Sequence, residues 1–358
     1  MVRAIAITAV TANSEVHMAC LLVGATRAGK SGGGNAVGWF SFPGFVGGMP
    51  IFSDQSARKN RRITGDKDKK LSKSGDATEM ATIFNENTVA AEPVDDGTAR
   101  QRLLTRARVA GTRILLDRLT LAPGATARLS VPVQGLAWFQ MLEGEATLAR
   151  GASTETLTDA NVVFLPPGFS ADIASRGGAA LLYGAVPDAA RLDPNLTKNP
   201  PAFRVVDWTR EPVLDSEHDA RKRIYLVTPK LFGTKAVKGE MIIYPPGTMA
   251  ANHHHVGAEH FMYVLRGRGT VYANERPFAV AKGDVIYYPD LERHYLEAAP
   301  DEELVFAEFF APGEFTTVWM DESQICTWTP TGRDIRGQIP AREIKAHSSA
   351  DVLSPGDV

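Results

Sequence analysis

The sequence is poor in cysteine, in net charge and in long apolar runs. Its two cysteines, Cys20 and Cys326, lie far apart among 358 residues and cannot form a disulfide framework or a CxxC metal or redox motif. No stretch reaches the roughly 18 apolar residues of a membrane span, and no clean signal-cleavage site follows the apolar run 4–10. A net charge of -2 excludes a chain that binds nucleic acid through bulk charge. We therefore expect a soluble, cytoplasmic protein whose partners include neither nucleic acid nor a membrane.

Glycine and proline, by contrast, are abundant, with 32 and 22 residues respectively. They separate short runs rich in β-branched and aromatic residues, such as 162–165, 240–244 and 285–288. Frequent turns between short runs of this kind are typical of strands rather than of long helices. The length corresponds to about two domains at roughly 100–200 residues each. The sequence therefore predicts an all-β protein with more than one domain.

Residues 1–99 are predicted to be an N-terminal extension that is partly disordered. Residues 53–79 contain eight Lys or Arg and five Asp or Glu, with too few apolar residues to offset the entropy lost on ordering. Residues 24–31 match the phosphate-loop pattern GxxxxGK(S/T). Three glycines, residues 32–34, follow at the point where a phosphate-binding helix would begin, and glycine disfavours a helix. This segment is therefore not expected to bind a nucleotide.

From about residue 100 the sequence contains two copies of one pattern of turns and strands. Corresponding landmarks are always separated by 123 residues: Gly124 and Gly247, Gly144 and Gly267, Pro166 and Pro289. An offset without gaps at these landmarks indicates a duplicated β module. We assign the first copy to residues 100–198, the second to residues 199–312, and a C-terminal tail to residues 313–358.

A cluster of histidines in the second copy indicates where the chemistry lies. Five of the eight histidines fall within residues 253–294. On a strand, alternate side chains share a face, so His253 and His255 project together while His254 points the other way. Folding would have to bring His260 and His294 to the same face. A histidine-rich turn exposed to solvent is the alternative interpretation of the HHH triplet.

The spacing of these residues resembles the two motifs of the cupin superfamily. The second copy fits the first motif, G(x)5HxH(x)4, from Gly247 through His253 and His255 to His260, with Gly267 after six further residues. In the second motif, Gly283 is followed after five residues by Pro289 and then by His294. The resemblance implies two tandem jelly-roll barrels in one chain. It also implies one metal ion bound by His253, His255, His260 and His294.

Two departures from the family pattern affect the ligand set. His260 stands where the family usually has a glutamate, and Glu259 precedes it; we favour His260 because strand alternation from Gly267 fixes its face. The positions of the first copy that match the four histidines are Ser130, Pro132, Ala137 and Ala171. None of these four residues is a usual metal ligand, so the first barrel is expected to be degenerate and the chain to bind one ion.

The resemblance leaves three classes of function open. All-histidine sites are similar to those of gentisate and salicylate dioxygenases, which implies an Fe(II) dioxygenase that binds O2 and a small chelating acid, possibly aromatic. The second class comprises redox-neutral hydrolases, lyases and isomerases that use Mn or Zn, such as ureidoglycine aminohydrolase. The third is a non-catalytic ligand-binding bicupin. Ligand type also allows Ni or Cu, and Fe(II) is the favoured ion.

Residues beyond the ligands are assigned by strand parity alone. Met262 shares a face with His260, and Leu296 shares one with His294, so both are expected to line the substrate pocket. Glu259 and Tyr263 are candidate acids or bases. Four nearby cations could pair with a substrate carboxylate, although each is expected to be a solvated surface charge; they are Lys238, Arg266, Arg268 and Arg293.

The C-terminal tail and the assembly complete the predictions. Trp319 and Trp328 suggest that residues 313–358 pack on a barrel or on a partner chain, while His347 is expected to be a lone surface histidine. We expect the protein to form a homo-oligomer.

Overall fold

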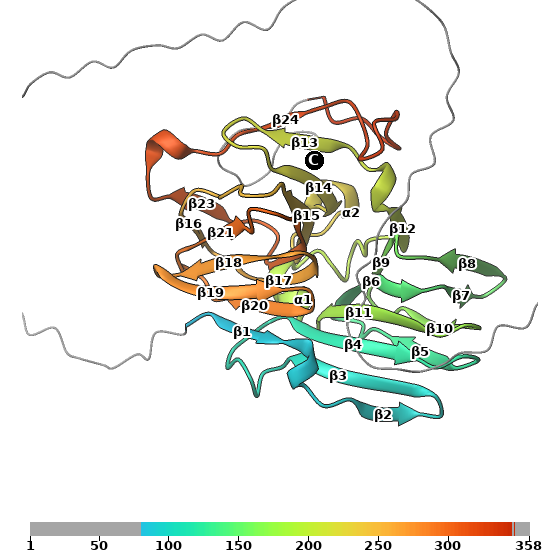
Figure 1. Cartoon of the computed structure of the whole chain (residues 1–358). Helices are drawn as coiled ribbons and strands as arrows, with labels where there is room; N and C mark the ends of the chain where they lie inside the picture. The colour runs from blue at the N-terminus through green and yellow to red at the C-terminus, as the bar shows by residue number, and fades with distance from the viewer. Residues whose placement is uncertain (1–79, 346, 348–358) are drawn as a thin grey trace, which may run out of the picture. The chain divides into compact units, whose positions relative to one another are not determined.

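Strands dominate the computed structural model, which describes residues 80–345 and residue 347. The phosphate-loop match, the charged segment 53–79 and Cys20 lie outside these residues. No helix within them is long and apolar enough to cross a membrane. Figure 1 shows two strand-rich halves, and the helices of the described residues are short. They are α1 (Ala189–Leu192), α2 (Pro229–Phe232), η1 (Glu86–Thr88), η2 (Trp208–Arg210) and η3 (Glu322–Gln324).

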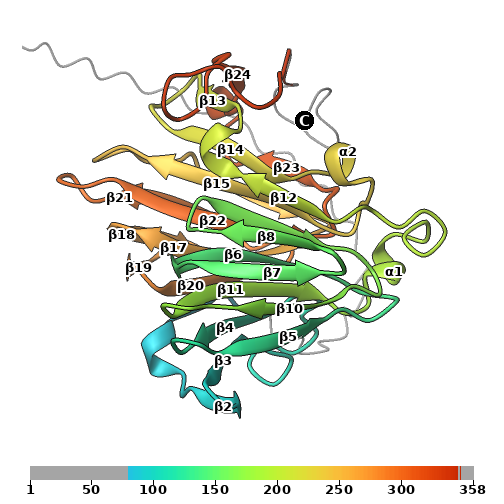
Figure 2. The same cartoon turned by 90° about the vertical axis from the view of Figure 1, so that its right-hand side faces the viewer.

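Over the described residues, a seven-stranded and a four-stranded sheet form what we call the first barrel. The strand orders are β12-β9-β6-β11-β4-β3-β2 and β5-β10-β7-β8, and Figure 2 views this half from the side of the smaller sheet. The bounds are β2 (Glu92–Asp95), β3 (Thr98–Leu104), β4 (Leu115–Leu121), β5 (Thr126–Ser130), β6 (Leu136–Gly144), β7 (Ala146–Arg150), β8 (Ser153–Leu157), β9 (Asn161–Leu165), β10 (Ser170–Ala174), β11 (Ala179–Val186) and β12 (Arg204–Asp207).

An eight-stranded and a five-stranded sheet, again within residues 80–345, form the second barrel. Their orders are β1-β20-β17-β22-β15-β14-β13-β24 and β19-β18-β21-β16-β23. The bounds are β1 (Thr82–Asn85), β13 (Val213–Ser216), β14 (Lys222–Val227), β15 (Lys238–Tyr244), β16 (His253–Val256), β17 (Glu259–Arg266), β18 (Arg268–Ala273), β19 (Arg276–Ala281), β20 (Asp284–Tyr288), β21 (His294–Ala298), β22 (Leu304–Ala311), β23 (Thr316–Trp319) and β24 (Trp328–Pro330). The all-β prediction is confirmed.

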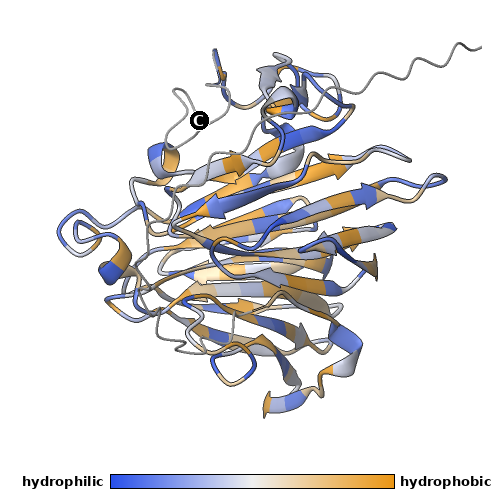
Figure 3. Cartoon of the chain, turned by 90° about the vertical axis from the view of Figure 1, so that its left-hand side faces the viewer, coloured by the Kyte–Doolittle hydropathy of each residue, from blue (hydrophilic) through white to orange (hydrophobic). Residues whose placement is uncertain are grey.

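Side-chain alternation explains why both halves have buried interiors. In β5 and β10 every second residue is buried, the pattern of strands with one face on a core. Figure 3 shows hydrophilic and hydrophobic segments alternating along many strands. Each barrel therefore encloses its own apolar core, one around Phe139 and Leu181 and the other around Ile286 and Phe306.

The strand order crosses the module boundaries assigned from the sequence. β1, from the predicted N-terminal extension, pairs with β20 of the second barrel, where Thr82 lies opposite Tyr287. β12, from the range assigned to the second module, pairs with β9 of the first barrel. β23 and β24, from the predicted tail, belong to the sheets of the second barrel. The sequence repeat shows which strands of the two modules correspond to each other. It does not show which free sheet edge a flanking segment pairs with, because that depends on which edge the segment can reach in the folded chain.

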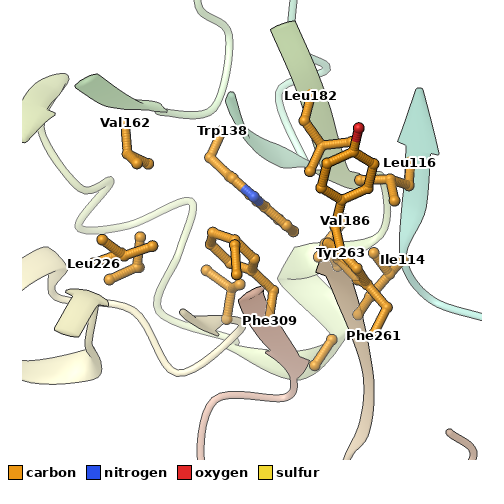
Figure 4. Close-up of a cluster of buried hydrophobic side chains, with 14 of the residues drawn as sticks. Ile114, Leu116, Trp138, Val162, Leu182, Val186, Leu226, Phe261, Tyr263 and Phe309 are labelled. Atoms are coloured by element: carbon orange, nitrogen blue, oxygen red, sulfur yellow. The ribbon is translucent and has the colours of Figure 1, made fainter. Parts of the chain in front are cut away.

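A third apolar core joins the two barrels (Figure 4). Trp138 of β6 stacks on Phe309 of β22 with 4.5 Å between ring centroids, and Phe261 of β17 lies 5.7 Å from Phe309. Gly184 gives the indole its space, because a Cβ there would lie 2.3 Å from Trp138 Cζ2. The large sheet of the second barrel is therefore buried on both faces.

Candidate metal centre

The four predicted histidines come together inside the second barrel. β16 carries His253 and His255, β17 carries His260, and β21 begins at His294. His253 and His294 lie opposite each other on paired strands, with ring centroids 4.4 Å apart. His260 lies 4.9 Å from His255 and 4.7 Å from His294, again between centroids. His253 and His255 of the HHH triplet therefore belong to a histidine cluster on strands of the barrel and not to a solvated turn.

Hydrogen bonds fix the orientation of three of the imidazoles. Nδ1 of His253 lies 2.9 Å from the carbonyl oxygen of Ala251, and Nδ1 of His294 lies 2.9 Å from that of Glu292. A carbonyl only accepts, so each Nδ1 donates and each Nε2 keeps its lone pair. Nδ1 of His255 is 3.1 Å from Thr317 Oγ1. This is how metal-binding imidazoles are held in proteins.

The opposite ring nitrogens are left without partners. Among the described residues, Nε2 of His255 and Nε2 of His294 are buried and have no hydrogen-bond partner, and the same holds for both ring nitrogens of His260. A buried polar atom without a partner carries a free-energy cost, so such atoms mark a place where an ion or a water belongs. These residues therefore fit a divalent ion.

Burial keeps the cluster uncharged at neutral pH. Burial lowers the pKa of His294 to about 4. Burial, followed by the charge of neighbouring imidazoles, also holds the pKa values of His253, His255 and His260 well below the usual histidine range. Neutral imidazoles are the form that binds metals.

Glu308 is a potential ligand that the sequence reasoning missed. In the described part of the chain, the ligand atoms of His253, His255 and His294 lie within 4.8 Å of one another, and so do those of His255, His260 and Glu308. Glu308 Oε1 is 3.3 Å from His260 Nε2. The sequence did contain a signal for this residue, since Glu308 is a single acid within the otherwise apolar strand β22. Buried carboxylates are rare unless they have a function or a partner.

The pKa values of two buried carboxylates near the cluster are shifted in opposite directions. Burial and then the charge of Glu240 raise the pKa of Glu308 well above the ordinary range, which favours its protonated form. Burial alone would raise the pKa of Glu240, but Arg223 and Lys238 beside it hold that pKa below its usual value. Arg223 Nη2 and Lys238 Nζ lie 3.2 Å and 3.4 Å from the Glu240 carboxylate. Lys238, expected at the surface, is therefore part of the pocket.

The cluster opens on a cavity of about 80 Å³. His253, His255 and the predicted pocket residues Met262 and Leu296 line it. Its cationic members lie just before β14, on β14 and on β15, and aromatic side chains of β14, β15, β22, β23 and β24 contribute to its walls. These further lining residues include Arg221, Arg223, Lys238, Phe310, Phe315, Trp319 and Trp328.

Neither predicted acid–base residue faces the cluster. Glu259 Oε1 accepts hydrogen bonds from the backbone N–H groups of Arg113 and Ile114 at 2.6 Å and 3.1 Å, and Tyr287 Oη donates to Glu259 Oε2 at 2.7 Å. Glu259 therefore ties the second barrel to a loop of the first. Its parity places it on the opposite face of β17 from His260.

Tyr263 lies on the same outer face as Glu259. Its hydroxyl donates to Glu86 Oε2 at 2.7 Å, and burial and this contact raise the pKa of Tyr263 far above the usual range. Both predicted acid–base roles are therefore inconsistent with the positions of these side chains.

The C-terminal segment completes the site. Thr317 lies on β23, which pairs with β16, and Trp319 lies 4.9 Å from His253 between ring centroids. Cys326 lies 3.2 Å from Arg221 Nη2 and is buried. His347, expected at the surface, lines the cavity and is hydrogen-bonded to Tyr225 Oη at 2.6 Å. Nothing in the sequence indicated that His347 lines the cavity, because His347 is far from the other histidines along the chain.

Comparisons with known proteins give one domain family and one fold. The family described as Cupin domain matches residues 240–310, which include every predicted metal ligand. The chain also has the fold of the Bacillus subtilis oxalate decarboxylase: one variant superposes with a TM-score of 0.52 at 18% identity, over 67% of this chain and 79% of that one. The second barrel therefore contains a match to the cupin domain. At 18% identity the likeness to the decarboxylase shows the fold alone.

Two further structures of the same decarboxylase match this chain over the same lengths. A second variant of the same decarboxylase has a TM-score of 0.53 at 18% identity, over 67% of this chain and 79% of that one. A further structure, concerned with the Mn(II) centres of that enzyme, has a TM-score of 0.51 at the same identity and coverage.

Two curated sequences match shorter parts of the chain. Oxalate decarboxylase OxdC of Bacillus subtilis is 31% identical over 94 residues, which is 25% of this chain and 24% of that protein. Uncharacterized protein MJ1618 of Methanocaldococcus jannaschii is 36% identical over 73 residues, 20% of this chain and 58% of that protein. The chain thus matches between a quarter and a little over half of the length of these relatives. The resemblance to gentisate and salicylate dioxygenases stays a prediction.

Proposed function

We propose that this bicupin is a metal-dependent enzyme that acts on a small carboxylic acid in a redox-neutral reaction, with decarboxylation as the first candidate. The observation that carries the proposal is one shared cavity. His253 and His255 of the histidine cluster line it together with the cations Arg223 and Lys238, and among the described residues Nε2 of His255 is buried without a hydrogen-bond partner. A chelating carboxylate needs both a metal and a compensating positive charge.

The ion would be held by His253, His255, His260 and His294. We favour Mn(II), because the decarboxylase that shares this fold is described with Mn(II) centres; Fe, Zn, Ni and Cu are the alternatives. A bound divalent ion supplies Lewis acidity toward a carboxylate oxygen.

The side chains of this chain have separate roles in the proposal. Arg223 and Lys238 bind and orient the carboxylate that is not cleaved, and Glu240 holds both cations in place. Glu308 keeps a proton inside the cavity, at a carboxyl group close to His260. This proton replaces the carboxyl group that leaves as CO2. Phe310 and Phe315 restrict the entry of water.

The size of the cavity selects among substrates. A cavity of about 150 Å³ binds benzene in an engineered protein, and the cavity at the histidine cluster is smaller, with about 80 Å³. An acid of two or three carbons fits this volume, whereas a substituted benzene ring does not. The cavity therefore favours a small aliphatic acid over the aromatic substrate that the sequence suggested.

The test uses full-length protein purified without a histidine tag and loaded with Mn(II). We expect CO2 release from oxalate or a small keto acid, without stoichiometric O2 consumption. His294→Ala should abolish turnover and His254→Ala should not, because His254 lies on the same strand but points away from the cluster. Absence of turnover with Mn(II), Fe(II) and Zn(II) would overturn the proposal.

An Fe(II) dioxygenase is the second candidate. It is favoured by one observation, the all-imidazole group of His253, His255 and His294, which contains no carboxylate. O2 uptake equal to substrate loss, together with iron as the metal that restores activity, would support this candidate against the first. We also retain a cytoplasmic location and a homo-oligomeric state as proposals.

A further inference from the structure

A second and larger cavity lies between the two barrels. Its volume is about 350 Å³, compared with about 80 Å³ for the cavity at the histidine cluster. The first barrel contributes residues of β6, among them Gln140 and Leu142, and the second contributes Met241, Tyr263 and Leu265 from β15 and β17. Cavities of roughly 300–1,000 Å³ are the size at which proteins bind small molecules.

This cavity is separate from the histidine cluster because it lies on the other face of the same strands. On β17, His260 and Met262 face the barrel interior, while Tyr263 and Leu265 line the inter-barrel cavity. On β15, Glu240 likewise lines the first cavity, whereas its neighbour Met241 lines the second. A ligand here would make no contact with the proposed metal ligands.

The walls of the cavity are mostly apolar. Met241, Ile243 and Val305 are buried side chains of the large sheet in the second barrel. Leu265 and Ile335 complete the apolar lining, and Ile335 comes from the C-terminal segment. Such a lining selects a ligand with an apolar body.

Most charged side chains around this cavity have partners within the protein, and the two without an ion pair among the described residues, Asp159 and Lys282, carry opposite charges. Arg266 pairs with Glu303. Glu86 accepts a hydrogen bond from Tyr263 Oη and pairs with Arg118 Nε at 3.3 Å. These groups therefore offer little uncompensated charge to a ligand, which favours a neutral one.

Gln140 supplies the specific polar contact. Its side chain is 3% exposed, and its Oε1 atom has no hydrogen-bond partner among the described residues. Trp138 and Gln140 share the outer face of β6, and Trp138 packs in the inter-barrel core. Burial of an amide oxygen without a donor is unfavourable, so a ligand that brings a donor gains from this position.

We propose that the inter-barrel cavity is a second binding site, for a neutral, largely apolar molecule of about two fused rings that carries one O–H or N–H donor. The donor bonds to Gln140 Oε1, and the apolar body lies against Met241, Ile243 and Leu265. The site does not depend on the proposed metal chemistry.

The test compares three probes of one shape by calorimetry on the full-length protein. The probes are 2-naphthol, 2-methoxynaphthalene, which lacks the donor, and 2-naphthoate, which is anionic. We expect one molecule of 2-naphthol per chain. The methoxy compound should bind about threefold to tenfold more weakly, the value of one hydrogen bond, and the anion should bind more weakly still.

Two kinds of variant locate the probe. Gln140→Leu should bind 2-naphthol and 2-methoxynaphthalene equally, because only the donor contact is lost. Leu265→Trp should fill the cavity and abolish binding; Ile335→Trp provides a second filling variant if the first does not fold, as judged by circular dichroism. His255→Ala is the matched control and should bind all three probes as the unaltered protein does, whether or not that variant retains metal.

Three outcomes would overturn the proposal. They are an absence of saturable 2-naphthol binding, binding that persists in both filling variants, and an unchanged preference for 2-naphthol in Gln140→Leu. Each can occur while the enzyme retains metal and activity, so failure of this site is distinguishable from failure of the proposed function.

Discussion

Thr317 Oγ1 lies 3.1 Å from Nδ1 of His255, although 62 residues separate the two in the chain. Thr317 belongs to β23, which pairs with β16 along the strand that carries His253 and His255. A residue outside the predicted metal-binding module thus orients one of the predicted ligands. The C-terminal segment is therefore part of the candidate centre.

Thr317→Val should weaken metal binding. The valine keeps the shape of the side chain but removes the hydrogen bond to His255 Nδ1, and loss of such a partner typically costs 10–100-fold in metal affinity. Competition with a chelator measures the effect. Thr316→Val is the control, because Thr316 neighbours Thr317 on β23 but points to the other face. Equal affinities for the two variants would contradict the prediction.

Glu240→Gln should destabilise the fold. The change removes the negative charge that compensates Arg223 and Lys238, and an uncompensated buried charge costs about 3–5 kcal/mol. Denaturant unfolding gives the free energy of unfolding. The control is Glu314→Gln, which breaks the exposed pair of Glu314 with Lys235 and should cost less than about 1 kcal/mol. If both variants lose the same small amount of stability, Glu240 does not have this role.

Glu259→Ala should lower stability without changing metal affinity. It leaves the backbone N–H groups of Arg113 and Ile114 without their acceptor, and each unsatisfied buried donor costs about 1–3 kcal/mol. Thermal unfolding and a metal titration on the same sample separate the two effects. A loss of metal binding in a variant that remains folded would restore Glu259 as a ligand.

Gly184→Ala should disturb the core between the barrels. The added Cβ would lie 2.3 Å from Trp138 Cζ2, and overpacking of this kind costs about 1–3 kcal/mol. Gly177→Ala is the matched control, since Gly177 has open space around it and no positive φ. Gly151→Ala would not serve, because Gly151 has a positive φ of 60° that strains any residue with a side chain. A fall in unfolding temperature for Gly184→Ala alone would verify the prediction.

The sequence by itself was sufficient for the local features of the second barrel. Spacing and parity placed His253 and His255 on one face of a strand, and Met262 with His260 on the next. These are properties of a few consecutive residues. The turn landmarks and the offset between copies likewise needed only the order of residues, so the duplicated all-β fold could be predicted.

Only the tertiary structure determined which distant residues enter the site. Glu308 and Thr317 reach the imidazoles because β22 and β23 lie beside β17 and β16 in the sheets. The same pairing turned Glu259 toward the first barrel. Strand pairing between segments far apart in sequence depends on the register and closure of the whole sheet. For that reason the sequence determined the fold class and the face of the strand that carries His253 and His255, and folding decided which acid, which cations and which part of the C-terminal segment surround the histidine cluster.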